Sequence, residues 1–209
     1  MLAAHRGASG EAPENTVAAF DLALSQGAEV VELDAHLTRD GVPVVIHDHT
    51  LERTTTGTGL VVERTLEELK GLDAGSWVSG RFWGQRIPTL EEVLEWAKGR
   101  AFLAIELKSL RLRYPGLAER VVGLLERHEA VDQVEVFSFD HPLVKQVKAL
   151  CPKVLTGVCY VGDVGDHVSL ALRAEAQALH PHWTGLRPEV VEEAHRAGLA
   201  VVPWTVNEA

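Results

Sequence analysis

Charged residues occur two positions apart in segments that have the composition of β-strands. Glu32 and Asp34 stand in "ELD", and Glu106 and Lys108 stand in "ELK". Residues two apart on a strand point to the same face, so each motif presents both side chains to one side of a sheet. Three converging carboxylates suit one hard divalent cation, Mg²⁺ or Ca²⁺. We favour this interpretation over an interior ion network in which the carboxylates only pair with Arg6 and Lys108.

Two histidines also end strand-like segments. His5 follows the apolar start of the chain, and His47 ends the run "VPVVIH". Imidazoles near a metal can remove and deliver protons around neutral pH. Either histidine alone is more often a core residue bonded to a backbone carbonyl, but their joint position with the acidic cluster favours acid–base catalysis. The structural interpretation is kept for the other histidines, including His36, His49, His180 and His182.

Two cationic side chains accompany these groups. Arg6 offers planar donors and Lys108 a point charge, and with a divalent cation they could hold a phosphate group. The formal net charge is −10, which argues against nucleic acid or an anionic membrane surface as a partner. A small anionic ligand bound at a locally positive site is therefore expected.

The segments that position these residues alternate between short β-rich runs and longer amphipathic runs. This alternation is typical of parallel strands joined by crossover helices. Seven such strands are predicted: the residues before His5, then 29–37, 101–109, 133–139, 153–161, 176–183 and 199–206. The helices between them are predicted at 15–27, 89–99, 116–129, 142–150, 166–176 and 188–198.

One strand departs from this pattern. Residues 42–48 follow the second strand across only "TRDG", and Asp40-Gly41 indicates a hairpin, so this strand should be antiparallel. Residues 49–87 then contain Thr and Gly clusters and have too few apolar residues for a core of their own. We interpret them as an inserted excursion within a single domain that spans residues 1–209.

Seven strand–helix units without a Gly-rich nucleotide loop favour an α/β fold of the TIM (β/α)₈ barrel type over a doubly wound sheet. The chain stops at "WTVNEA", so we expect the last strand and helix to be missing and the barrel to remain open. No stretch is long enough to span a bilayer and no signal-peptide pattern is found, which predicts a cytoplasmic protein without a membrane anchor. Cys151 and Cys159 lack metal-type spacing and are interpreted as buried, inert thiols.

Five motifs, in this order, resemble those of glycerophosphodiester phosphodiesterases: "HRG" with "ENT", "ELD", "HDHTLERTTTGTG", "ELK" and "WTVN". The resemblance covers nearly the whole chain, from His5 to Asn207. It implies a TIM barrel with a small insertion after the second strand. The implied reaction is metal-dependent hydrolysis of a glycerophosphodiester to glycerol 3-phosphate and an alcohol, with either water or the substrate's own glycerol hydroxyl as the nucleophile.

The resemblance also implies a role for each matching residue of this sequence. The implied ligands of one divalent cation are Glu32, Asp34 and Glu106. The implied acid–base pair is His5 and His47. The implied substrate-binding residues are Arg6 and Lys108 at the phosphate, Glu14 and Asn15 as supporting residues, and Trp204 as a wall for the glycerol moiety.

Two other functions are compatible with parts of this pattern. A barrel aldolase would use Lys108 as a Schiff base, but it would leave the two histidines and three acids without a role. A non-catalytic barrel that binds phosphate esters would need neither His5 nor His47, and both are present. We therefore rank both below the hydrolase.

Overall fold

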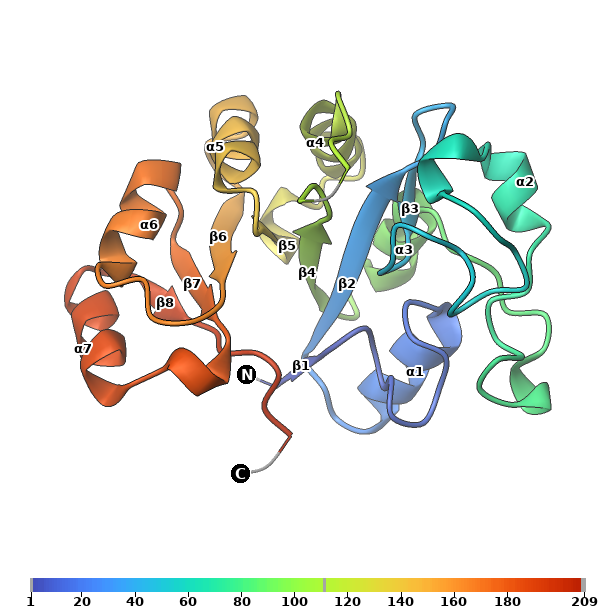
Figure 1. The fold of residues 1–209 in the computed structure, drawn as a ribbon, viewed down its shortest axis with the longest axis horizontal. Coiled ribbons are helices and arrows are strands. Elements are labelled where there is room, and N and C mark those ends of the chain that lie inside the picture. The colour runs from blue at the N-terminus through green and yellow to red at the C-terminus, as the bar shows by residue number, and fades with distance from the viewer. Residues whose placement is uncertain (1, 111, 208–209) are drawn as a thin grey trace.

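The fold is a curled parallel β-sheet with helices on its outer side, as the computed structural model shows for residues 2–110 and 112–207 (Figure 1). The strands are β1 (Ala3–Ala4), β2 (Val30–Leu37), β3 (Pro43–Val45), β4 (Phe102–Leu107), β5 (Val134–Ser138), β6 (Leu155–Tyr160), β7 (Ala178–Pro181) and β8 (Ala200–Val201). The α-helices are α1 (Val17–Ser25), α2 (Leu66–Lys70), α3 (Leu90–Ala97), α4 (Leu117–Arg127), α5 (His141–Leu150), α6 (His167–Ala174) and α7 (Pro188–Arg196). None of the helices within these described residues is both long and apolar enough to cross a membrane.

The strand order confirms the predicted topology. Seven strands run parallel in the order β1-β2-β4-β5-β6-β7-β8, and β3 pairs antiparallel with β2, as predicted from the hairpin signal. β2 and β4 are neighbours whose register places Asp34 beside Glu106, so the two acidic motifs lie side by side. Within the described residues β1 and β8 form the two edges of the sheet, which is therefore an open barrel.

The last strand is much shorter than predicted. Residues 199–206 were expected to form a strand, but β8 covers only Ala200–Val201, and pairing continues as a single bridge between His182 and Trp204. The N–H groups of Val202 and Trp204 still donate to the carbonyls of Leu179 and Pro181, but Pro181 on β7 has no N–H to donate back, which interrupts the ladder. The strand was predicted at the correct position but with too many residues.

Side chains along each strand point alternately outward, into the core beneath the helices, and inward, into the interior of the barrel. On β2 and β4, the outward-facing Leu33, Leu103 and Ile105 belong to a large hydrophobic cluster that also contains residues of α1, α3 and α4. A smaller apolar layer lies inside the curl and includes Phe137 and Cys159. Both cysteines, Cys151 and Cys159, are buried and free, and burial raises the pKa of the Cys159 thiol, which agrees with the prediction of inert thiols.

The turn after β1 requires a glycine. Gly7 has a φ of 78°, and a β-carbon there would stand 2.7 Å from the backbone carbon of Ala19 on α1. α1 begins after Thr16, whose side chain caps the helix by accepting a hydrogen bond from the N–H of Ala19. The close approach of this loop to α1 holds "HRG" and "ENT" together at one end of the sheet.

The segment between β3 and α3 contains α2 and two short 3₁₀ turns, Val61–Glu63 and Gly80–Phe82, on the right of Figure 1. Its buried apolar side chains gather with those of β3 in one cluster: Val44, Ile46, Leu51, Val61, Leu69, Ala74 and Ile87. The segment therefore packs through β3 onto the sheet, beside the end of β2.

Candidate active site

The three predicted metal ligands meet at the carboxyl ends of β2 and β4. Glu32, Asp34 and Glu106 are all buried, and one carboxylate oxygen from each lies within 4.8 Å of the others. The shared face of each strand and the Asp34–Glu106 register produce this convergence. These carboxylates are called the acidic cluster below.

Two cationic side chains contact the acidic cluster. The Nζ of Lys108 lies 2.9 Å from Asp34 Oδ1 and 2.8 Å from Glu106 Oε1. The Nε of Arg6 lies 3.5 Å from Asp34 Oδ2. Two positive charges thus face three carboxylates, and Asp34 Oδ1 accepts no well-aligned hydrogen bond despite its ion pair.

The electrostatics of the acidic cluster suit an added cation. Burial and the neighbouring carboxylates raise the pKa of Glu32 well above its usual value. Burial and Asp34 likewise raise the pKa of Glu106, against the opposing effect of Lys108. Burial would also raise the pKa of Asp34, but Lys108, His47 and Arg6 outweigh it and hold that pKa at about 2. The surplus of negative charge on an all-oxygen set fits a hard divalent ion.

The "HRG" and "ENT" motifs are bonded to the acidic cluster and to each other. Arg6 has a left-handed backbone, with φ at 59°, and its N–H donates to Glu32 Oε2 at 2.8 Å. Its guanidinium donates to Glu14 Oε1 at 3.0 Å. Asn15 donates to Asp34 Oδ2 at 2.8 Å and accepts from the Asp34 N–H at 3.3 Å. Glu14 and Asn15 therefore contact the cationic and acidic side chains of the site.

The two predicted acid–base histidines flank the acidic cluster. His5 Nε2 lies 3.9 Å from Glu32 Oε2, and its Nδ1 lies 3.4 Å from the hydroxyl of Thr205. Burial and the nearby Arg6 lower the pKa of His5 to about 4. Burial also lowers the pKa of His47, despite the Asp34 carboxylate nearby. Both rings are therefore neutral near pH 7, as proton acceptors must be.

A second ion network, which sequence reasoning did not assign, holds the ring of His47. Asp48 Oδ1 accepts from His47 Nδ1 at 2.6 Å, and Arg53 donates to both oxygens of Asp48, at 2.6 and 3.0 Å. The same guanidinium donates to both oxygens of Glu14 at 2.8 Å. Arg53 thereby links the His47 segment to the "ENT" loop, and the only sequence signal for it is its place within "HDHTLER".

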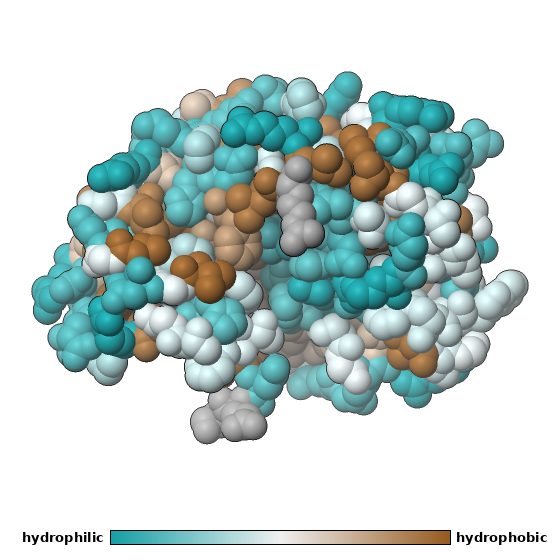
Figure 2. Space-filling model, viewed as in Figure 1, coloured by the Kyte–Doolittle hydropathy of each residue, from teal (hydrophilic) through white to brown (hydrophobic). Residues whose placement is uncertain are grey.

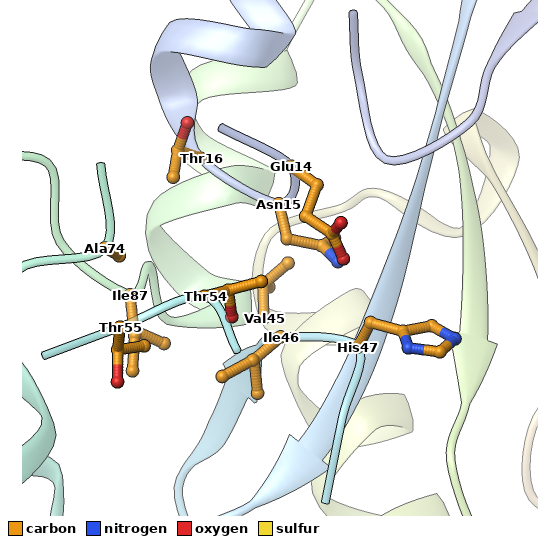
Figure 3. Close-up of a pocket in the computed structure, with 10 residues that line it drawn as sticks. All are labelled: Glu14, Asn15, Thr16, Val45, Ile46, His47, Thr54, Thr55, Ala74 and Ile87. Carbon is orange, nitrogen blue, oxygen red and sulfur yellow. The ribbon is translucent and has the colours of Figure 1, made fainter. Parts of the chain in front are cut away.

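Figure 3 shows the cavity next to this network. Glu14, Asn15 and His47 lie at one end, and Ile87 and Ala74 lie at the other. The imidazole of His47 points away from the apolar end of the cavity. The apolar side chains thus support the segment that carries His47.

His36 and His180 have structural partners, which agrees with the structural interpretation given to the histidines outside the acid–base pair. His36 is fully buried, with Nε2 at 3.0 Å from the His47 carbonyl and Nδ1 at 2.7 Å from the Tyr114 hydroxyl. His180 is buried inside the curl, where it bonds Glu135 at 2.9 Å. Burial lowers the pKa of His36 to about 3, so it is a neutral donor and acceptor.

Trp204 belongs to the opposite half of the barrel. Its Nε1 donates to the His180 carbonyl at 2.9 Å, and its ring meets those of His182 and Phe139 edge to face. The next residue, Thr205, reaches His5, so the aromatic group borders the site. Figure 2 shows a hollow between the two halves, with hydrophilic groups gathered on its right side and apolar groups along its left and upper rim.

Comparison with known proteins identifies the arrangement. Residues 5–209 match the model of the glycerophosphoryl diester phosphodiesterase family. A glycerophosphodiester phosphodiesterase of Caldanaerobacter subterraneus subsp. tengcongensis is 43% identical over 99% of this chain and 86% of its own length. One of Bacillus altitudinis is 40% identical over 98% of this chain and 85% of its own.

Solved structures agree with these sequence matches. An Oleispira antarctica phosphodiesterase, in complex with the product sn-glycerol-3-phosphate, superimposes with a TM-score of 0.91 at 36% identity, covering 99% of this chain and 84% of that one. A glycerophosphodiester phosphodiesterase from Agrobacterium tumefaciens gives 0.86 at 36% identity, covering 99% and 87%. The resemblance seen in the motifs is confirmed: the chain belongs to the glycerophosphoryl diester phosphodiesterase family.

Proposed function

We propose that this protein hydrolyses glycerophosphodiesters to glycerol 3-phosphate and an alcohol. The observation that carries the proposal is the convergence of three carboxylates, two cationic side chains and two neutral imidazoles at one end of the curled sheet. The relative from Oleispira antarctica, whose structure holds sn-glycerol-3-phosphate as product, supports the substrate class.

The acidic cluster is proposed to hold one divalent cation, Mg²⁺ or Ca²⁺. Glu32, Asp34 and Glu106 would be its protein ligands, and the raised pKa of Glu32 is the mark of a carboxylate that lacks a counter-charge. When bound, the cation would neutralise phosphate charge and favour the more negative transition state. Arg6 and Lys108 contact the same carboxylates and would bind the remaining phosphate oxygens.

His5 and His47 are proposed to move the protons. One neutral ring takes a proton from the attacking hydroxyl, and the other, after gaining a proton from solvent, gives it as an imidazolium to the leaving oxygen. Asp48 accepts the Nδ1 proton of His47, which leaves Nε2 of that ring free to face the substrate. Glu14 and Asn15 hold the cationic and acidic groups in place, and Trp204 forms a wall of the substrate site.

The geometry disfavours a Schiff base at Lys108. Burial opposes its positive charge, but Asp34 and Glu106 outweigh burial and raise the pKa of the ammonium. An amine held in its protonated form by two ion pairs is a poor nucleophile toward a carbonyl. Lys108 is therefore assigned to phosphate binding.

The test is an assay of glycerol 3-phosphate released from glycerophosphocholine and glycerophosphoethanolamine, with Mg²⁺, with Ca²⁺ and with a chelator. We expect release that needs a cation, and we expect His5→Ala and His47→Ala each to lose nearly all turnover while calorimetry shows intact cation binding. His195→Ala, on the exposed face of α7, is the matched control. Absence of release with every cation would contradict the proposed function, and loss of cation binding in either variant would make that histidine a ligand instead.

A further inference from the structure

We propose that His36 and Tyr114 are positioning residues for His47, a role that rests on the function proposed above. The two side chains hold the His47 main chain at the point where it leaves the sheet. Neither residue touches the acidic cluster through a hydrogen bond that the structure shows, so they would act on the reaction through His47.

His47 lies just beyond the regular backbone ladder. The pairing of β2 with β3 reaches Ala35 and Val45, and the N–H of Ile46 still donates to the Asp34 carbonyl at 3.0 Å. One residue further on, the His47 carbonyl meets His36 Nε2 at 3.0 Å. A buried imidazole thus continues the connection to β2 where the backbone ladder stops.

The direction of each proton in this contact follows from chemistry. A carbonyl only accepts, so Nε2 of His36 carries the proton and its Nδ1 must accept. The Tyr114 hydroxyl, 2.7 Å away, therefore donates to Nδ1. The hydroxyl oxygen lies 3.3 Å from Nδ1 of His49, which can donate to it. The donors form one directed chain that ends on the His47 carbonyl, and such chains strengthen each bond within them.

The contact also fixes segments from separate parts of the chain. His36 lies one residue before the end of β2, His47 follows β3, and Tyr114 lies in the connection between β4 and α4. The rings of His36 and Tyr114 meet edge to face at 5.3 Å, and both residues are buried. Asp48 holds the His47 ring and His36 holds its backbone, so the two contacts together define where Nε2 points.

Three variants test the role. His36→Phe keeps a ring but removes both hydrogen bonds, His36→Gln keeps an amide N–H near the position of Nε2, and Tyr114→Phe removes only the hydroxyl. We expect His36→Phe to lower kcat about 10- to 100-fold with KM changed less than about twofold, as for a misplaced catalytic group. His36→Gln should recover most of that loss, and Tyr114→Phe should fall between them. His195→Gln, on exposed α7, is the control.

A second readout does not depend on turnover. The imidazole ¹⁵N resonances of His47 should report a proton on Nδ1 in the wild type and in His36→Gln, and a mixture of tautomers in His36→Phe. Unchanged kcat in folded variants, a change in KM alone, or equal losses for Gln and Phe would each overturn the proposal. A wild type that releases no glycerol 3-phosphate would refute the proposed function, while the His47 resonances would still decide the positioning role.

Discussion

Replacing Arg53 by glutamine should slow the reaction far more than it destabilises the protein. The guanidinium makes four hydrogen bonds to Asp48 and Glu14, and its side chain is 43% exposed. Ion pairs of such exposure contribute about 0.2–1 kcal/mol each, so the loss of two pairs should lower the free energy of unfolding by about 1 kcal/mol. For a chain of this size, that is a fall in Tm of roughly 2–4 °C.

The effect on turnover should be larger because the His47 ring loses its support. Asp48 would keep its bond to His47 Nδ1 but lose both bonds to Arg53. Loss of such a supporting partner typically costs about 10- to 100-fold in function, here in kcat. That range corresponds to about 1.4–2.7 kcal/mol in the activation barrier.

The variant should also respond differently to pH. The Arg53 hydrogen bonds are the main reason that the pKa of Asp48 lies below its usual value of 3.8. A depressed carboxyl pKa contributes stability above the unfolded pKa and loses it as pH falls through the folded pKa. Without Arg53 the folded pKa of Asp48 rises, so protonation of Asp48 and loss of its bond to His47 begin at higher pH. The fall of kcat on the acid side of its pH profile should therefore move to higher pH.

The measurement is kcat and KM for glycerophosphocholine at saturating cation across the acid and neutral range, together with thermal unfolding. Arg100→Gln is the matched control because Arg100 pairs with Asp21 at 2.8 Å and is 47% exposed, away from the site. Wild-type kcat in Arg53→Gln, or an equal loss in Arg100→Gln, would refute the positioning role of Arg53.

Four other predictions concern Glu32, two glycines and Asp73. Because the folded pKa of Glu32 is raised, its ionisation lowers the stability of the protein as the pH rises above 4.5. Mg²⁺ or Ca²⁺ should therefore raise Tm more at pH 8 than at pH 5. Thermal unfolding with and without chelator measures this gain, and Glu32→Gln should reduce it. A β-carbon at Gly157 would stand 2.6 Å from the His180 ring, so Gly157→Ala should destabilise by about 1–3 kcal/mol in urea unfolding. Gly123→Ala on α4, with nothing within 4 Å, should instead stabilise by about 0.5–1 kcal/mol. Asp73 accepts three backbone N–H groups that depress its pKa, so Asp73→Asn should cost about 1–3 kcal/mol at pH 7 and progressively less as the pH falls below 3.8.

The parallel sheet could be predicted because each strand and helix carries its own local signal. The hairpin before β3 was likewise visible in Asp40-Gly41, and Gly41 has a φ of 75°. The extent of β8 could not be predicted from its own hydrophobicity, since Pro181 on the neighbouring strand β7 lacks the N–H that would continue the ladder. The end of a strand depends on which backbone N–H groups are hydrogen-bonded to the neighbouring strand, and the hydrophobicity of a segment does not reveal this.

The acidic cluster could be predicted because period-two spacing sets the direction of both side chains in "ELD" and "ELK". The partners of His47 could not. Arg53 reaches Glu14 across 39 positions of the chain, and Tyr114 reaches His36 across 78. Such contacts depend on how loops fold over the ends of the strands, and their residue types, Arg and Tyr, are common on ordinary surfaces.

The two halves of the sheet carry different kinds of side chain. β1, β2, β3 and β4, with their loops, carry both proposed proton-transfer groups, the acidic cluster and both cations, whereas β5 to β8 contribute the aromatic border around Trp204. Under the proposed function, mutations in the second half would reshape the wall for the glycerol moiety and leave the charged groups of the first half in place.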